Sequence, residues 1–123
     1  MKRVLVVEDN RSLLHGLLRL LEGAGFQAAG VSDFEGAEKL VRQERFDFLV
    51  TDVDLPGGTG LELVSLARLL RPEMEAIVVT GYGCSAVRQR AEELNVRGYL
   101  EKPFDPGVLL RLICAPGTVP QSV

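Results

Sequence analysis

Short apolar runs alternate with stretches of helical spacing along this chain, and the alternation occurs five times. The predicted strands lie at residues 4–7, 26–31, 46–52, 76–80 and 97–101, with the second the weakest. Between them, hydrophobic residues recur at intervals of three and four, which predicts helices at about 13–21, 33–43, 59–69, 87–94 and 105–115. Strands that alternate with helices predict an α/β fold, with one parallel sheet covered by helices on both faces.

Local signals mark where three of these helices begin. Asn10 has the side chain of a good N-cap for the first helix. Thr59, with Glu62 three residues later, forms a capping box ahead of the third. Asp105 followed by Pro106 is typical of a helix start, and places the beginning of the last helix there.

The length of 123 residues, with 46% hydrophobic and 25% charged residues, fits one globular domain. We expect this domain to span residues 1–115, and residues 116–123, which lack periodicity, to form a tail or the start of a linker. The net charge is −3 and no basic block occurs, so direct nucleic-acid binding is not expected. No apolar stretch reaches the roughly 18 residues of a membrane span and no signal peptide is recognisable, so the prediction is a cytoplasmic protein without membrane contact.

Four further side chains are expected in ordinary structural roles. Cys84 and Cys114 fit no metal-ligand spacing, and we expect both to be buried or half-buried free thiols. Arg68 and Arg71 fall near the end of the third predicted helix, where their charges would complement the helix dipole.

Polar side chains stand where the predicted strands end. Glu8 and Asp9 follow the first strand, Asp52 ends the third, Thr80 ends the fourth and Lys102 follows the fifth. Because ligands of an open parallel sheet bind at the carboxyl ends of its strands, we expect these five side chains to converge. Three carboxylates, a hydroxyl and an ammonium group together predict a site for a divalent cation and a phosphoryl group.

The three carboxylates would repel one another if nothing neutralised them. Two unit charges 4 Å apart cost about 4 kcal/mol at an effective dielectric constant near 20. All the candidate ligands are hard oxygens, which favours Mg²⁺ or Mn²⁺ over zinc. The alternative for Glu8 and Asp9 alone is a solvated acidic loop. With a cation in place, Asp52 is the natural nucleophile, because a carboxylate can form an acyl phosphate.

The order and spacing of four motifs resemble the receiver domain of two-component response regulators. The motifs are residues 4–10 (VLVVEDN), 52–56 (DVDLP) followed by Gly60, 79–81 (VTG) and 99–104 (YLEKPF). The resemblance covers essentially residues 1–114. It implies a single-domain, doubly wound (βα)5 fold with the flavodoxin-like strand order 2-1-3-4-5, as in the chemotaxis regulators of this family.

The resemblance also implies a function for the acidic site. Asp52 would accept a phosphoryl group from a phosphohistidine of a sensor histidine kinase or a histidine phosphotransfer protein. Glu8, Asp9, Asp52 and the backbone carbonyl of Asp54 would hold Mg²⁺, and Lys102 would bind a phosphoryl oxygen. Such a protein is a self-phosphorylating and self-dephosphorylating phosphoacceptor, and not a turnover enzyme.

The same resemblance implies a conformational switch. Thr80 would bind a phosphoryl oxygen and move toward the phosphate, while Tyr99 turns inward. The face formed by the fourth helix, fifth strand and fifth helix would then be remodelled and would act on a downstream protein or a fused effector domain. Two positions are hypothesised to set the dephosphorylation rate: Asp54, two residues beyond the acceptor, and Tyr82, two beyond the switch threonine.

Two other functions stay open at this point. Asp52 and Asp54 two residues apart after a strand also resemble haloacid-dehalogenase-type phosphatases, in which the second Asp is an acid/base. The acidic pair at Glu8 and Asp9 and the lack of room for a cap domain argue against that family. The other alternative is a receiver-like binding module that is never phosphorylated, although such modules usually lack part of the acidic site.

Overall fold

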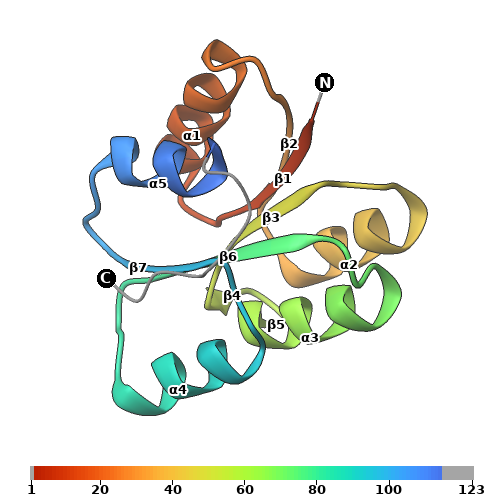
Figure 1. The fold of residues 1–123 in the computed structure, drawn as a ribbon, viewed down its shortest axis with the longest axis vertical. Helices are drawn as coiled ribbons and strands as arrows, with labels where there is room; N and C mark the ends of the chain where they lie inside the picture. The colour runs from red at the N-terminus through yellow and green to blue at the C-terminus, as the bar shows by residue number, and fades with distance from the viewer. Residues whose placement is uncertain (1, 115–123) are drawn as a thin grey trace.

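The computed structural model describes residues 2–114, which form one five-stranded sheet with helices on both sides (Figure 1). In chain order the elements are β1 (Arg3–Val7), α1 (Arg11–Gly23), β2 (Gln27–Val31), α2 (Phe34–Gln43), β3 (Phe48–Asp52), β4 (Asp54–Leu55), β5 (Gly58–Thr59), α3 (Gly60–Leu70), β6 (Glu75–Thr80), α4 (Ser85–Glu93), β7 (Gly98–Glu101) and α5 (Pro106–Cys114). The predicted tail at 116–123 lies outside the described residues.

The five long strands are parallel and lie in the order β2-β1-β3-β6-β7. Because β6 and β7 are the fourth and fifth of these strands along the chain, the predicted order 2-1-3-4-5 is confirmed. The order reverses at β1 and β3, whose carboxyl ends are adjacent: Val7 pairs with Thr51 in the ladder. This reversal is where ligands bind in open α/β sheets.

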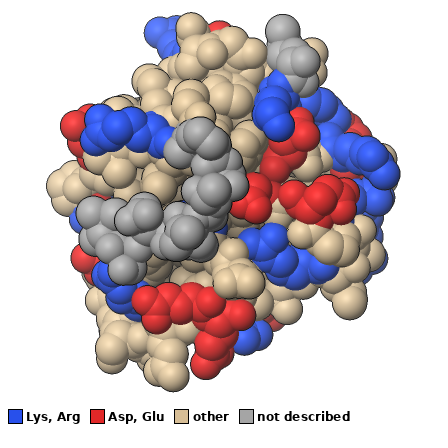
Figure 2. Space-filling model, viewed as in Figure 1, with Lys and Arg blue, Asp and Glu red and all other residues tan. Residues whose placement is uncertain are grey.

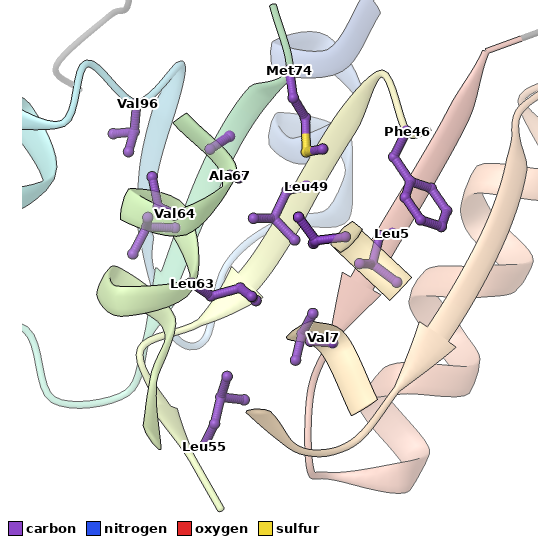
Figure 3. Packing of buried hydrophobic residues seen from close by; sticks show 14 of the residues in the cluster. Leu5, Val7, Phe46, Leu49, Leu55, Leu63, Val64, Ala67, Met74 and Val96 are labelled. Carbon is purple, nitrogen blue, oxygen red and sulfur yellow. The ribbon is translucent and has the colours of Figure 1, made fainter. Parts of the chain in front are cut away.

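Two hydrophobic cores lie on opposite faces of the sheet. One is formed with α1 and α5 and contains Leu17, Leu21 and Leu109. The other is formed with α2, α3 and α4, and Figure 3 shows part of it, with Leu49 of β3 facing Val64 and Leu63 of α3. Every residue of β3 is buried, as expected of a central strand covered on both faces.

The predicted helix starts are confirmed where they rest on capping side chains. The Asn10 side chain accepts a hydrogen bond from the Leu13 N–H at 3.0 Å. Thr59 and Glu62 form the reciprocal capping box at the start of α3, with distances of 3.1 and 3.0 Å. At the start of α5, the Asp105 side chain accepts from the Gly107 N–H at 2.9 Å.

One prediction about ordinary residues was wrong. Cys84 and Cys114 are free thiols but both are exposed, because each falls at a helix end on the outer surface. Arg68 lies in the last turn of α3, as predicted. Its guanidinium also donates to the carbonyls of Leu94 and Asn95 at the end of α4, which was not predicted.

Acidic and basic side chains lie next to one another on the face shown in Figure 2. Four helix ion pairs of this kind join Glu35 with Lys39, Glu38 with Arg42, Arg88 with Glu92, and Arg90 with Glu93. Such exposed pairs contribute little to stability.

Candidate functional site

Three carboxylates meet at the carboxyl edge of the sheet. Glu8 and Asp9 follow β1, and Asp52 is the last residue of β3. One carboxylate oxygen from each lies within 4.8 Å of the other two. Glu8 and Asp52 are only 2% and 5% exposed, whereas Asp9 is exposed. The structure therefore brings together the three carboxylates that the sequence predicted to converge.

Lys102 lies between two of these carboxylates. Its Nζ is 2.7 Å from Oδ2 of Asp52 and 2.9 Å from Oε1 of Glu8. The backbone directs it there, because the Lys102 N–H continues the ladder by donating to the Thr80 carbonyl at 2.8 Å. The following Lys102–Pro103 peptide bond is cis. The ammonium group of Lys102 thus contacts two of the three carboxylates in the cluster.

Burial and pairing act in opposite directions on these charges. Burial raises the pKa of Glu8 above its usual value, although the hydrogen bonds from Lys102 and from the Asn10 backbone oppose this. Burial alone would lower the pKa of Lys102, but its hydrogen bonds to Asp52 and Glu8 outweigh that effect and its pKa is raised. The ammonium group is therefore held in its charged form beside the two carboxylates.

Two backbone amides hold the carboxylates in place, and neither contact was predicted from the sequence. The Asn10 N–H donates to Oε2 of Glu8 at 3.0 Å, and the Asp54 N–H donates to Oδ1 of Asp52 at 3.1 Å. Each of the two buried carboxylates thus has one oxygen on a backbone amide and the other on Lys102. The side chain of Asp54 itself is exposed.

A cavity of about 890 Å³ opens over this cluster. Its polar lining includes the three carboxylates, Lys102 and Asp54, and its apolar lining includes Leu13, Leu17 and Phe104. Tyr82 is 85% exposed and also lines the cavity. The space is large enough for a phosphoryl group and for part of a donor beside it.

The two predicted switch residues lie on the neighbouring strands β6 and β7. Thr80 is fully buried, and its Oγ1 accepts a hydrogen bond from the Tyr82 N–H at 3.1 Å. Tyr99 is in β7, with the guanidinium carbon of Arg88 5.3 Å from its ring centroid. In the described part of the chain, neither Thr80 nor Tyr99 lines the cavity.

The acidic cluster fits a hard divalent cation. All its donors are carboxylate oxygens, and the cluster contains neither imidazole nor thiolate. Two of the carboxylates are buried and already oriented by backbone amides, so little ordering would be needed to bind an ion. Glu8, Asp9 and Asp52 are the side chains that could hold Mg²⁺ or Mn²⁺.

The comparison with known proteins decides between the families left open above. The sequence profile of the response regulator receiver domain matches residues 4–114. The chain belongs to this family. A receiver is a phosphorylation-activated signalling domain and not a classical turnover enzyme, so the phosphatase alternative is not favoured. Receivers bind Mg²⁺ through acidic residues and interact with histidine kinases and effectors.

Individual relatives agree with the family assignment. The photosynthetic apparatus regulatory protein RegA of Rhodobacter capsulatus is 32% identical over 116 residues, which cover 94% of this receiver and 63% of RegA. A CheY-like receiver domain protein from Methanospirillum hungatei JF-1 superposes with a TM-score of 0.88 at 30% identity, over 92% of this chain and 90% of that one.

A response regulator from Burkholderia pseudomallei, whose structure contains a phosphorylated aspartic acid, a calcium ion and citrate, has a TM-score of 0.85 at 30% identity. The match covers 94% of this chain and 68% of that one. The receiver spans only 26% to 63% of the length of four curated relatives. None of the described helices combines the length and the apolar character that crossing a membrane requires.

Proposed function

We propose that Asp52 is the phosphoacceptor of this receiver. The observation that carries the proposal is its position: a nearly buried carboxylate at the strand-order reversal, 2.7 Å from the Lys102 ammonium and clustered with two further carboxylates. In the transfer, an Asp52 oxygen forms a bond to phosphorus while the bond from phosphorus to the donor nitrogen breaks. The electron pair of the broken bond stays on the donor imidazole.

The surrounding residues have separate roles in this proposal. Glu8, Asp9 and Asp52, with the backbone carbonyl of Asp54, hold Mg²⁺, which when bound supplies positive charge to the phosphoryl oxygens. Lys102 binds a phosphoryl oxygen with the ammonium group that now lies between Asp52 and Glu8. These carboxylates keep the lysine charged and aimed before the phosphoryl group arrives.

Thr80 and Tyr99 convert phosphorylation into a change of shape. The Thr80 hydroxyl now accepts a hydrogen bond from the Tyr82 N–H. It turns to the phosphoryl group, because donating to a charged phosphoryl oxygen gives a stronger hydrogen bond. That movement vacates space into which the Tyr99 ring rotates, and the face of α4, β7 and α5 is remodelled. Such a two-state element, biased by one added charge, is the physical basis of the switch.

The donor is a sensor histidine kinase or a histidine phosphotransfer protein, and the remodelled face acts on a downstream protein or a fused effector domain. We place this signalling in the cytoplasm, without direct nucleic-acid binding by this domain. Asp54 and Tyr82 line the cavity beside Asp52, so they are placed to set how long the self-dephosphorylating acyl phosphate lasts.

Mass spectrometry after incubation with acetyl phosphate and Mg²⁺ tests the acceptor assignment. We expect one phosphoryl group per wild-type chain, none without Mg²⁺ and none in Asp52→Asn. Asp47→Asn, in the same segment but at the opposite edge of the sheet, is the control and should label normally. Labelling that survives in Asp52→Asn would refute the assignment, and steady turnover of a phosphomonoester would favour the phosphatase alternative instead.

A further inference from the structure

A small antiparallel hairpin follows Asp52 directly. Asp54 pairs with Thr59 and Leu55 with Gly58. The hairpin closes on the end of β3, because the Gly60 N–H donates to the Val53 carbonyl at 2.7 Å. The segment that supplies the Asp54 amide to Asp52 is therefore a defined structure, and its position fixes that hydrogen bond.

A hairpin with two residues in each strand is not stable by itself, so its position depends on what it packs against. Leu55 anchors one strand: it is buried, and Figure 3 shows it at one end of the core cluster, beyond Leu63 and Val7. The other strand, Gly58 and Thr59, has no such apolar side chain. Its support comes from α2.

Phe34, the first residue of α2, supplies this support. Its N–H donates to the Pro56 carbonyl at the hairpin turn at 3.0 Å. Its ring lies close to Gly58: a Cβ atom added there would be 2.7 and 2.8 Å from two ring carbons. Gly57 has a φ of +89°, which favours glycine, but Gly58 is not in the left-handed region. Contact with the Phe34 ring is thus what excludes a side chain at Gly58.

We propose that Phe34 is a positioning residue for the phosphoacceptor site. Its ring presses on Gly58 and holds the hairpin where the Asp54 N–H meets Asp52 and where the Asp54 carbonyl is presented to the metal. The inference rests on the proposed function, because it assigns Phe34 a role in that same site. Phe34 acts through the hairpin, and its ring contacts Gly58 and not the carboxylates.

A double-mutant cycle on Phe34→Ala and Gly58→Ala tests this role. Loss of the ring, or insertion of a methyl group against it, should weaken Mg²⁺ binding measured by calorimetry by about tenfold, as loss of an outer support of a metal site commonly does. In the metal-free protein, the Asp54 and Gly60 amides should exchange faster with solvent in both variants. Labelling of Asp52 by acetyl phosphate should slow in parallel.

The interaction energy between positions 34 and 58 in this cycle decides whether Phe34 has the proposed role. Once Phe34→Ala has removed the ring, adding Gly58→Ala should change Mg²⁺ affinity by less than about twofold, because the two ring contacts have gone and only the Cβ of residue 34, 3.3 Å away, remains. Phe26→Ala is the matched control. Phe26 is also half-buried, but it packs edge-on against Phe48 near the opposite edge of the sheet. It should lower thermal stability and leave Mg²⁺ affinity unchanged.

The outcomes separate the two proposals. If the wild-type protein neither binds Mg²⁺ nor labels at Asp52, the proposed function fails. If the wild type does both and the single variants match it, or if their effects simply add, the role of Phe34 is overturned. Should Phe34→Ala not fold, Phe34→Leu and Gly58→Ala decide the question by the same measurements.

Discussion

Glu8 and Asp9 are adjacent carboxylates that the fold treats differently. Glu8 is 2% exposed and bound on both sides, by Lys102 and by the Asn10 amide, whereas Asp9 is exposed. Burying a carboxylate is unfavourable unless it is paired, so Glu8 is fixed in position by its partners. Asp9 keeps its hydration and can turn toward an ion when one binds. The pair thus combines one preoriented ligand with one adaptable ligand.

Asp54 and Tyr82, which are both exposed and line the cavity, should control the lifetime of the acyl phosphate. Asp54→Ala removes a carboxylate that can orient the attacking water, and we expect the lifetime to lengthen by about tenfold or more. Tyr82→Ala opens the cavity to water, so we expect it to shorten the lifetime. Decay of the labelled protein followed by mass spectrometry measures both. Glu92→Ala, an exposed carboxylate on α4, is the control; lifetimes equal to the control in both variants would contradict this role.

Tyr99 makes stability depend on pH in the alkaline range. Burial raises the pKa of its hydroxyl above the usual 10.0, and the nearby Glu101 carboxylate acts in the same direction. The folded state therefore favours the neutral phenol, and this contribution is complete below pH 10.0 and is lost as pH rises through the higher folded pKa. The pKa of Lys102 is also raised, so the contribution of its ammonium group to stability is lost in the same alkaline range. In urea unfolding above pH 10.0, the free energy of unfolding should decline less with pH in Tyr99→Phe than in wild type. Identical declines in the two proteins would contradict the role of Tyr99.

At the level of elements, short-range signals were readable and long-range contacts were not. The capping box at Thr59 and the cap at Asn10 were predicted because each involves residues three apart. The β4–β5 hairpin was not predicted, because its position depends on the contact of Gly58 with Phe34, which is distant in the sequence. The contacts of Arg68 with Leu94 and Asn95 were missed because these partners are 26 and 27 residues away.

Arg68 should hold the carboxyl end of α4. Its guanidinium donates to the carbonyls of Met74, Leu94 and Asn95 at 2.6, 3.0 and 2.6 Å, and Arg68→Ala leaves these groups without that donor. We expect a loss of about 2–3 kcal/mol in the free energy of unfolding, since hydrogen bonds from a charged donor are among the stronger ones. Hydrogen exchange should accelerate at the end of α4.

Arg90→Ala is the control for this measurement, because Arg90 forms an exposed ion pair with Glu93 on α4 and should contribute little. Equal effects of the two substitutions would show that Arg68 is an ordinary surface residue. The start of α4 differs from its end, because Cys84 provides no side-chain cap there and Ala91 is the helix's only buried residue. The end nearest the cavity is thus the less firmly held.

For the whole molecule, the strand order explains why the site could be predicted from sequence and its lining could not. Parallel strands place their carboxyl ends at one edge of the sheet, so residues at the ends of neighbouring central strands lie close together whatever the loops do. This brought Glu8, Asp52 and Lys102 together without knowledge of any contact. The cavity walls depend instead on how α1 and the segment after β7 pack, which brings Leu13 and Phe104 to the same opening. Such packing follows from the complete fold and not from a local pattern.

The acidic edge should make the stability of the whole domain depend on Mg²⁺. Folding gathers three carboxylates within 4.8 Å, with Lys102 as the cation between two of them, and unfolding disperses them. An ion that binds only the folded state should therefore raise the free energy of unfolding, by about 2.7 kcal/mol at a hundredfold excess over its Kd. In Asp9→Asn, repulsion is lower and a ligand is lost, so stability without metal should not fall while the Mg²⁺ response shrinks. Urea unfolding with MgCl₂ against KCl of equal ionic strength measures both, and an equal response to the two salts would show screening of charge instead of binding.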